Sequence, residues 1–365
     1  MKILFITNIC PHYHIKPFEE LSNMFSVDFV FTSDGKEYHE GQNNFQKVNF
    51  KYEYILPSFS RPFKLVKLIV SRDYDIIIKC SSGGYLILFV FLVAKIAGKK
   101  FIFWSNIWHY GPVLRQKIAK LIHGILYRGS NVIVTYGDHI DDYIIRHFDK
   151  INRNKLFHSY NVIDNKIFSN PPPDYDIDIV RRKLNINKND IVLLFVGRED
   201  PVKGLYYLFE ALKKLKYKRG FKLIIVGGKA SEVENEEIVY LSYQNQSNLK
   251  TLYYISDILV LPSITTDLSK ETWGLVVNEA MNCGNAIIAT DAVGAAVGGL
   301  LKDGITGYTV HEKDSRALEN AIDKLLLNEE LLKEMQTRNK EIIKMFDEKL
   351  FAKGFQEAVD YVFNN

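Results

Sequence analysis

Short apolar runs rich in β-branched residues alternate with segments of helical period along most of this 365-residue chain. Such alternation predicts parallel strands joined by helices that cover both faces of a sheet. The first half contains the runs KILFIT, VDFVFTS, DIIIKC, KFIFWSN and NVIVTYG, and the second contains DIVLLFVG, FKLIIVG, EIVYLS, DILVLPS and NAIIATD. Because the pattern occurs twice, we predict two doubly wound α/β domains.

A break separates the two halves. Residues 169–178 read SNPPPDYDID, where neither a strand nor a helix is expected to continue. We therefore predict a first Rossmann-like domain over residues 1–168 and a second over 169–345. Residues 346–365 are predicted to form a helix that returns to the first domain. Two such domains are expected to face each other across a cleft, with ligands at the carboxyl ends of the strands.

Composition and the apolar runs bear on the cellular compartment. Hydrophobic residues make up 47% and charged residues 25% of the chain, as is typical of soluble globular proteins. The start MKILFITNIC does not read as a secretion signal, and the apolar stretch 85–97 is shorter than the ~18 residues that a membrane span requires. Cys10, Cys80 and Cys283 have no disulfide or metal spacing, so we predict reduced, buried thiols. A cytoplasmic protein is expected.

Positive charge is concentrated in one segment. Twelve basic and two acidic residues between Arg61 and Arg128 give a net +10, so the formal total of +4 leaves −6 for the rest. This asymmetry favours a polyanionic partner or an anionic membrane surface. No nucleic-acid recognition motif accompanies the charge, so nucleic acid is not predicted as a partner. Solvated lysines on helix exteriors are the alternative explanation.

The run GREDPVKG follows the first strand of the second half. Gly197 permits a tight exit from that strand, and Arg198 and Lys203 stand five positions apart ahead of a predicted helix. A guanidinium and an ammonium beside a helix N-terminus are suited to a diphosphate. The alternative is a βα loop with two solvated cations. No P-loop or dinucleotide-binding glycine pattern is present.

A second motif, ETWGLVVNEAM, contains two acids eight positions apart, Glu271 and Glu279. We predict a helix that begins near Gly274, with Thr272 as its cap and with free amides at its first residues, Leu275 among them. The two acids would then be separated by at most ~12 Å. They would accept hydrogen bonds from sugar hydroxyls on either side of a bound diphosphate, because a buried carboxylate requires such partners.

These motifs occur in the order GREDPVKG, DILVLPS, ETWGLVVNEAMNCGNAIIATDAVG and LLKDGITGY. In them the chain resembles the retaining glycosyltransferases of family 4 (glycosyl transferases group 1), most strongly from Asp190 to Tyr308. The resemblance implies the GT-B fold, with an acceptor-binding first domain and a second domain that binds a nucleotide-sugar donor. It assigns Arg198 and Lys203 to the donor diphosphate, Glu279 to the ribose and Glu271 to the transferred sugar. The implied donor site comprises Gly197, Arg198, Lys203, Glu271, Gly274, Leu275 and Glu279.

The first domain matches the family less closely. Its first loop reads NICPHYHIKPFEEL where many members have two glycines, and it contains His12 and His14 as acceptor-loop candidates. His109 follows the strand KFIFW, where the family often has an active-site histidine, so the resemblance implies a catalytic set of His109, Arg198, Lys203 and Glu271. A core or surface histidine is the alternative for each of the three histidines.

Two Asp-x-Asp patterns occur in the chain. They bear on metal dependence, because another glycosyltransferase fold uses such a motif to bind a metal. Asp73 and Asp75 precede their strand, at the wrong end for a ligand site, and Asp174 and Asp176 lie in the proline-rich break. We interpret both as solvated turns and predict neither a metal nor another cofactor.

The predicted function is that of a retaining, metal-independent hexosyltransferase in cell-surface polysaccharide or glycolipid biosynthesis. It would transfer a sugar from a UDP-sugar, or alternatively a GDP-sugar, to a glycan or lipid-linked acceptor. The resemblance to the family implies front-face substitution. A sugar-nucleotide epimerase of the same fold and a non-catalytic sugar-nucleotide-binding protein are the alternatives.

A lipid-linked acceptor would bring the enzyme to the inner face of the membrane as a peripheral protein. In the segment 115–128 one helical stripe is apolar, and it consists of Ile118, Leu121, Ile122, Ile125 and Leu126. Lys117, Lys120 and Arg128 lie towards the margins of this stripe. Either the stripe inserts into the membrane interface, or it packs on the sheet as most helices of βα units do.

Overall fold

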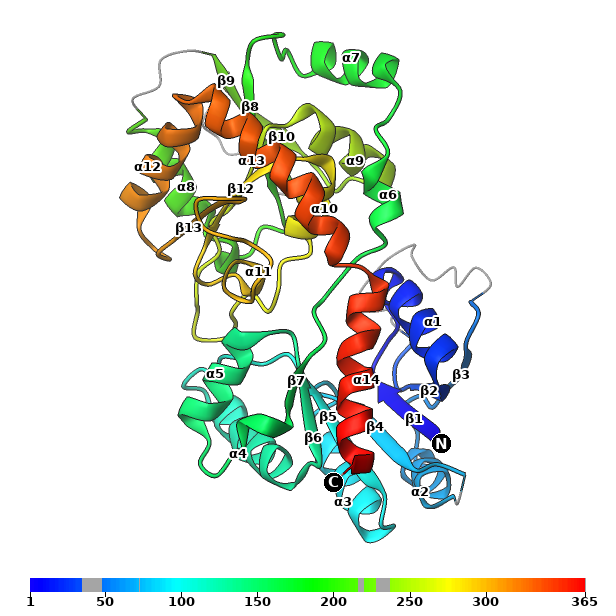
Figure 1. Ribbon diagram of the computed structural model, residues 1–365. Coiled ribbons are helices and arrows are strands. Elements are labelled where there is room, and N and C mark those ends of the chain that lie inside the picture. Colours follow the sequence, from blue (N-terminus) through cyan, green and yellow to red (C-terminus); the bar gives the residue numbers. More distant parts are fainter. Residues whose placement is uncertain (35–47, 72, 216–219, 228–236, 365) are drawn as a thin grey trace. The chain divides into compact units, whose positions relative to one another are not determined.

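The computed structural model describes residues 1–34, 48–71, 73–215, 220–227 and 237–364. The chain divides into two compact units (Figure 1). The first unit comprises Met1–Ile163 with Asp347–Asn365, and the second comprises Asp164–Phe346. The boundaries lie five residues before and one residue after those expected from the sequence. Arg72, one of the twelve basic residues counted above, lies outside the described residues.

The first unit contains a seven-stranded sheet with the order β3-β2-β1-β4-β5-β6-β7, in which all pairs are parallel. Its strands are β1 (Lys2–Thr7), β2 (Ser26–Phe31), β3 (Lys51–Tyr54), β4 (Ile76–Cys80), β5 (Lys100–Ser105), β6 (Val132–Thr135) and β7 (Leu156–His158). The edge strands β3 and β7 were not expected, because β3 is exposed throughout and β7 has only three residues.

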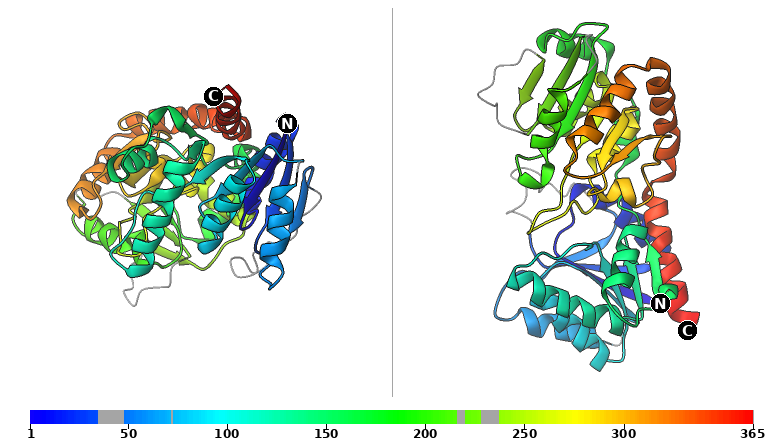
Figure 2. Two further views of the ribbon diagram at one scale, coloured as in Figure 1. Left: turned by 90° about the horizontal axis from the view of Figure 1, so that it is seen from below. Right: turned by 90° about the vertical axis from the view of Figure 1, so that its left-hand side faces the viewer.

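Helices cover both faces of this sheet (Figure 2). They are η1 (His12–His14), α1 (Ile15–Met24), α2 (Arg61–Val70), α3 (Tyr85–Ile96), α4 (Leu114–Gly129), α5 (Asp138–His147), η2 (Arg153–Lys155) and α14 (Glu348–Asn364). Right-handed crossovers place α2, α3 and α4 on the face opposite α1, because they connect strands in the opposite direction along the sheet. Helix α14 packs against α1, β6 and β7, and so belongs to the face of α1.

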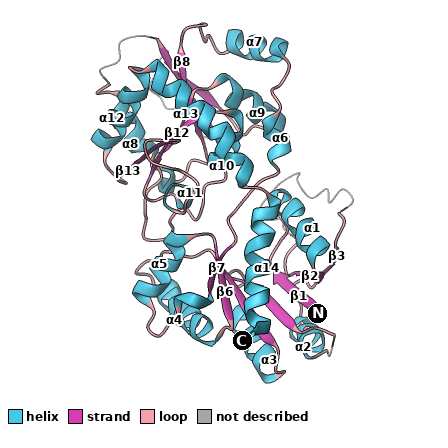
Figure 3. Cartoon of the chain, in the orientation of Figure 1, coloured by secondary structure: helices cyan, strands magenta, loops and turns pink. Residues whose placement is uncertain are grey.

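The second unit contains a six-stranded parallel sheet with the order β10-β9-β8-β11-β12-β13. Figure 3 distinguishes the strands of the chain from the helices around them by colour. Its strands are β8 (Ile191–Val196), β9 (Phe221–Val226), β10 (Ile238–Leu241), β11 (Ile258–Leu261), β12 (Ala286–Thr290) and β13 (Gly307–Val310). Its helices are α6 (Asn165–Ser169), α7 (Asp174–Lys183), η3 (Pro201–Lys203), α8 (Leu205–Leu212), α9 (Gln246–Ile255), α10 (Val276–Cys283), α11 (Gly294–Val297), α12 (Ser315–Leu326), α13 (Glu329–Ile342) and η4 (Ile343–Met345). The prediction of two doubly wound α/β domains is confirmed.

The predicted break is only partly irregular. Its second half is helical, since α7 begins at Asp174 directly after Pro173. Two acids, Asp174 and Asp176, stand in the first turn, and three bases occupy the last turn of α7. Charges in these positions favour a helix because they complement its macrodipole. The expectation that no helix forms over residues 169–178 is therefore wrong for its second half.

The strand order of each sheet reverses once. In the first unit β1 lies between β2 and β4, and in the second unit β8 lies between β9 and β11. The loops that leave β1 and β4, and those that leave β8 and β11, therefore turn to opposite faces. A crevice forms at such a reversal, at the carboxyl edge of the strands, and open α/β sheets bind their ligands there.

Aromatic side chains join α14 to the core of the first unit. The Phe5 ring centroid lies 5.3 Å from that of Phe18 and 5.5 Å from that of Phe355. Gly354 brings the helix backbone against β7, because a Cβ atom at this position would lie 1.8 Å from the carbonyl oxygen of His158. The glycine thus sets how closely α14 approaches the sheet.

Replacing Gly354 by alanine should destabilise the first unit. Alanine is favoured over glycine within a helix by about 1 kcal/mol. The methyl group would nevertheless force α14 away from β7, and such overpacking typically costs about 1–3 kcal/mol. We expect a lower urea midpoint for Gly354→Ala. Gln356→Ala, at an exposed position of the same helix, is the control and should change the free energy of unfolding by less than about 0.5 kcal/mol. Equal or greater stability of Gly354→Ala would contradict the close packing.

Candidate functional site

Two loops meet at the strand reversal of the second unit. The loop after β8 contains η3, whose first amides are capped by Asp200, since the carboxylate accepts a hydrogen bond from Val202 N at 3.0 Å. Gly204 follows with a φ of 64°, and a Cβ atom there would lie 1.9 Å from the carbonyl oxygen of Pro262 in the loop after β11. A residue without a side chain is needed for this contact, which fixes the two loops against each other.

Lys203 and Glu271 form an ion pair between these loops. Lys203 Nζ lies 2.5 Å from Glu271 Oε2, and each side chain is only 17% exposed. Ser263 Oγ donates to the same carboxylate oxygen at 3.4 Å. The stem of Lys203 runs beside Gly197, where a Cβ atom would lie 3.4 Å from Lys203 Cδ and Cε. The structure therefore brings the cation expected to bind phosphate directly to the acid expected beside the sugar.

Arg198 behaves differently from Lys203. Its side chain is exposed, and within the part of the chain that the structure describes it has no ion-pair partner. The two cations expected together on a diphosphate thus differ: Lys203 is paired and half-buried, whereas Arg198 extends from the loop after β8.

Helix α10 begins at Val276, two residues later than expected. Leu275 is its N-cap residue and makes no side-chain cap hydrogen bond, so the prediction that Thr272 caps the helix is wrong. Glu271 forms a parallel β-bridge with Val293. This bridge keeps the chain just before α10 extended, so that Thr272 does not lie at the helix N-terminus as a cap residue would. Gly274 turns the chain into the helix with a φ of 89°. Among the described residues, the amides of Gly274 and Leu275 have no acceptor.

Glu279 lies in the first turn of α10 and is partly buried. Tyr253, from α9, donates its hydroxyl hydrogen to Glu279 Oε2 at 2.7 Å. Burial raises the pKa of Glu279 to about 7, although the hydrogen bond from Tyr253 acts in the opposite direction. Sequence reasoning missed Tyr253, because it lies outside every recognised motif and only the packing of α9 on α10 brings it to the acid.

The first unit has a cavity of about 280 Å³ at its own strand reversal. The carboxyl ends of β1, β4 and β5 and the loops that follow β1, β4, β5 and β6 line it. The lining includes Asn8, Tyr13, His14, Ser82, Asn106 and Tyr136. This is where an α/β sheet is expected to bind a ligand.

The three predicted histidines occupy different environments. Only His14 lines the cavity; His12 is exposed, and His109 is half-buried in the loop after β5. His14 is packed between the rings of Phe18 and Trp104, and its Nε2 lies 3.4 Å from Asn161 Oδ1. Burial lowers the pKa of His14 to about 3, against the smaller raising effect of Asn161. The ring is therefore neutral at physiological pH.

Lys79, one of the twelve basic residues between Arg61 and Arg128, is completely buried. Its ammonium donates to the carbonyl oxygens of Cys80 at 2.9 Å and of Ser82 at 2.7 Å, and lies 3.6 Å from Cys80 Sγ. Burial raises the pKa of the Cys80 thiol, but Lys79 and two hydroxyl groups outweigh it, so the net shift is downward. Cys80 and Cys283 are buried free thiols as predicted, whereas Cys10 is only partly buried.

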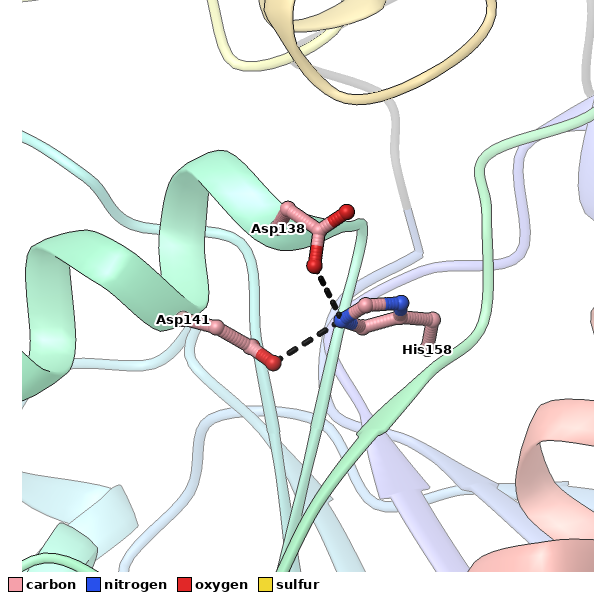
Figure 4. Close-up of side chains that lie close together, drawn as sticks. All are labelled: Asp138, Asp141 and His158. Carbon is pink, nitrogen blue, oxygen red and sulfur yellow. Dashed lines mark hydrogen bonds and ion pairs between the residues drawn. The ribbon is translucent and has the colours of Figure 1, made fainter. Parts of the chain in front are cut away.

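Asp138, Asp141 and His158 form the one group among the described residues with donor atoms close enough for a metal ion, all within 4.8 Å (Figure 4). His158 Nε2 lies 2.8 Å from Asp141 Oδ2 and 3.7 Å from Asp138 Oδ1. Burial lowers the pKa of His158, but Asp141 raises it more, so the net shift is upward. Thr135 donates to the other oxygen of Asp141 at 2.6 Å. These hydrogen bonds account for the cluster without an ion.

Both Asp-x-Asp patterns have local explanations. Asp75 accepts a hydrogen bond from Lys2 N at 2.9 Å, at the amino edge of the first sheet. Asp174 and Asp176 belong to the first turn of α7. Neither pattern lies at a strand carboxyl end, and the absence of a metal requirement stays a prediction.

Comparison with solved structures decides the fold. Crystal structures of Anabaena HepE in complex with UDP and with UDP-glucose cover 99% of this chain, with TM-scores of 0.76 and 0.74 and 17% sequence identity. The crystal structure of WaaG, a glycosyltransferase of lipopolysaccharide biosynthesis, covers 98% with a TM-score of 0.66 and 14% identity. The chain has the GT-B fold. At these identities the GT-B likeness concerns the fold alone.

The match to a protein-family model lies within the second unit. Residues 176–342 match the family model of glycosyl transferases group 1. A lipopolysaccharide 1,2-N-acetylglucosaminetransferase of Salmonella typhimurium is 30% identical over 172 residues, which cover 42% of this chain and 44% of that protein. A D-inositol 3-phosphate glycosyltransferase of Mycobacterium tuberculosis is 31% identical over 180 residues, which cover 42% and 35%. The matches thus span less than half of these relatives and support a group 1 glycosyltransferase.

The raised pKa of Glu279 predicts a pH-dependent stability. The folded state binds the carboxyl proton of Glu279 more tightly than the unfolded state does. The contribution of this proton to the free energy of unfolding is fully present below the ordinary carboxyl pKa and is lost as pH rises through about 7. Glu279→Gln, which is always neutral, should therefore raise the melting temperature more at about pH 8 than at about pH 5. Glu330→Gln, at an exposed position, controls for the removal of one charge. If Glu279→Gln raised the melting temperature equally at both pH values, Glu279 would not titrate in this range.

Proposed function

We propose that this chain is a retaining, metal-independent glycosyltransferase that moves a sugar from a nucleotide-sugar to a glycan or lipid-linked acceptor. One observation carries the proposal: Lys203, Glu271 and the free amides of Gly274 and Leu275 converge at the strand reversal of the second unit. The family match over residues 176–342 and the names of the relatives support glycosyl transfer.

The donor diphosphate would occupy the start of α10. Backbone amides of Gly274 and Leu275 donate to phosphate oxygens there, and the helix dipole favours negative charge. Lys203 and the exposed Arg198 would add an ammonium and a guanidinium. As the sugar leaves, negative charge grows on the diphosphate, and these fixed donors stabilise it without reorganisation. Arg198 has no competing partner among the described residues, so it is available to the phosphate.

Lys203 must change partners when the donor binds. In the ion pair it donates to Glu271 at 2.5 Å, and a phosphate oxygen would compete with that carboxylate. Release of Glu271 would then allow it to accept hydrogen bonds from hydroxyls of the transferred sugar. Donor binding would thus prepare the sugar-binding acid.

Glu279 would hold the ribose. Its carboxylate, with the pKa raised to about 7, needs hydrogen-bond donors to remain charged, and two vicinal hydroxyls are suitable donors. Tyr253 already occupies one oxygen, which orients the carboxylate and leaves the other oxygen for a ligand.

The acceptor would bind in the first unit, for which the polar cavity lined by Asn8, His14 and Asn106 is the candidate. His109 is retained as the candidate beside the donor sugar and His12 as a second acceptor-loop residue. A UDP-sugar is the favoured donor, because the HepE structures contain UDP and UDP-glucose. The names of the lipopolysaccharide transferases support a role in the synthesis of surface polysaccharide or glycolipid. A cytoplasmic location is part of the proposal.

A donor and acceptor screen tests the function. UDP, GDP and their sugars should be compared by thermal shift, because a ligand that binds the native state raises the melting temperature. The donor that stabilises the protein should then be turned over only with an acceptor, with retention at the anomeric carbon and in the presence of EDTA. Conversion to an epimer without acceptor would favour a sugar-nucleotide epimerase. Saturable binding without turnover with any acceptor would favour a binding protein.

Alanine variants separate the roles of the two charged partners. Lys203→Ala should weaken binding of the free nucleoside diphosphate roughly ten- to hundred-fold, the equivalent of one charge-assisted hydrogen bond of about 1.5–3 kcal/mol. Glu271→Ala should leave this affinity unchanged or increase it, because it removes the competitor for Lys203, while turnover falls. Isothermal titration and initial rates measure the two effects. Lys213→Ala, on an exposed lysine of the same unit, is the control. A loss of diphosphate affinity in Glu271→Ala would contradict the partner exchange.

A further inference from the structure

Helix α4 turns an apolar stripe outward. Leu114, Ile118, Leu121 and Ile125 follow one another at helical spacing, and all four are exposed, Leu114 by 72% and Leu121 by 71%. The helix packs on the first sheet through its other side, which consists of His123, Gly124, Leu126 and Tyr127. Of the stripe expected from the sequence, only Leu126 is fully buried, so the alternative in which the stripe packs on the sheet does not hold for its main part.

Two neighbouring helices extend this surface. Helix α3 contacts both α2 and α4 on the same face of the sheet. Ile96 at the end of α3 is 88% exposed, and Phe63 in the first turn of α2 is 70% exposed. Figure 2 (right) shows these helices on the side of the sheet away from α14. We call the solvent-exposed side of α2, α3 and α4 the cationic face.

Basic residues surround the apolar side chains. The three helices contain eight lysines and arginines and no aspartate or glutamate. Exposed cations are Lys64 and Lys67 on α2, Lys95 on α3, and Arg115, Lys117 and Arg128 on α4. No acid on these helices therefore neutralises them. An aliphatic centre with a rim of cations is the composition of helices that lie in a membrane interface.

We propose that the cationic face docks reversibly on an anionic membrane surface. The exposed leucines and isoleucines of α4 would enter the boundary between headgroups and acyl chains, and the lysines and arginines around them would pair with lipid phosphates. No described helix is long and apolar enough to span a membrane, so the attachment is interfacial. The proposal rests on the surface alone and does not depend on the proposed function.

Other partners fit this face less well. A nucleic acid would engage the cations but would leave the aliphatic stripe of α4 in water. A second copy of the chain would cover the stripe but would bring the two sets of cations together without any acid on α2, α3 or α4 to pair with them. An anionic lipid surface can pair with the cations through its phosphates and can also take up the aliphatic stripe of α4 among its acyl chains.

Vesicle co-sedimentation tests the docking. Full-length protein should bind vesicles that contain about 30% phosphatidylglycerol at low salt, should bind pure phosphatidylcholine vesicles much more weakly, and should be released at about 0.5 M salt, where charge interactions are screened. Arg115→Gln with Lys117→Gln should lower the partition coefficient about 25-fold, because each near-surface cation contributes roughly fivefold. Leu114→Ser with Leu121→Ser should lower it further, by roughly tenfold for each leucine.

Matched changes in the second unit control for general effects. Lys183→Gln with Lys188→Gln, and Leu268→Ser with Leu327→Ser, alter exposed residues of the same types and should leave vesicle binding unchanged. Thermal shift with UDP should be the same in all variants, which separates the docking from donor binding. The proposal is overturned by absent binding at low salt, by equal binding to neutral vesicles, or by equal losses in the controls. Salt-sensitive binding to a DNA oligomer in place of vesicles, or a dimer that Leu121→Ser dissociates, would also overturn it.

Discussion

Parallel pairing of every strand is the constraint on which this molecule depends. A parallel strand must be followed by a crossover to the opposite end of the sheet, so all carboxyl ends lie at one edge and all connecting helices lie on the two faces. Where the strand order reverses, two adjacent loops turn away from each other and leave a crevice. The Lys203–Glu271 pair lies at one such reversal and the cavity beside His14 lies at the other. Both candidate sites thus follow from the same topology.

Three partly or fully buried ionisable side chains, those of Lys203, Lys79 and Glu279, show how the fold offsets the desolvation free energy of a charged group. Lys203 is stabilised by an opposite charge, since its ammonium lies 2.5 Å from Glu271. Lys79 is stabilised by two backbone carbonyl oxygens, those of Cys80 at the end of β4 and of Ser82 in the loop that follows. Glu279 accepts a hydrogen bond from the hydroxyl of Tyr253, but burial outweighs this contact and raises the pKa of Glu279 to about 7. A buried group that lacks a full set of partners is a candidate for a ligand, because the ligand can complete that set.

Sequence periodicity was sufficient to predict the fold because the central strands are buried on both faces and read as continuous apolar runs. The edge strand β3, KYEY, has no such run, and α7 was missed because three prolines obscured the favourable charges that follow them. For the candidate site, the motif ETWGLVVNEAM identified both acids, although only Glu279 lies on α10 and Glu271 precedes it in a segment bridged to Val293. The motif could not predict that Lys203 pairs with Glu271 or that Tyr253 contacts Glu279, since these residues are brought together by tertiary packing alone. The burial of Lys79 and the outward orientation of Leu121 likewise depend on which side of an element faces the core.

The position of α14 has a consequence for biosynthesis. This helix is translated after the whole second unit, yet Phe351 and Phe355 pack against Trp104 and Phe5 in the core of the first unit. The ribosome therefore completes the whole second unit, residues 164–346, before the first unit receives its final helix. Until then, the aromatic cluster around Phe5 lacks the packing partners that α14 supplies. The apolar core of the first unit is therefore completed by a segment that is synthesised only after the second unit.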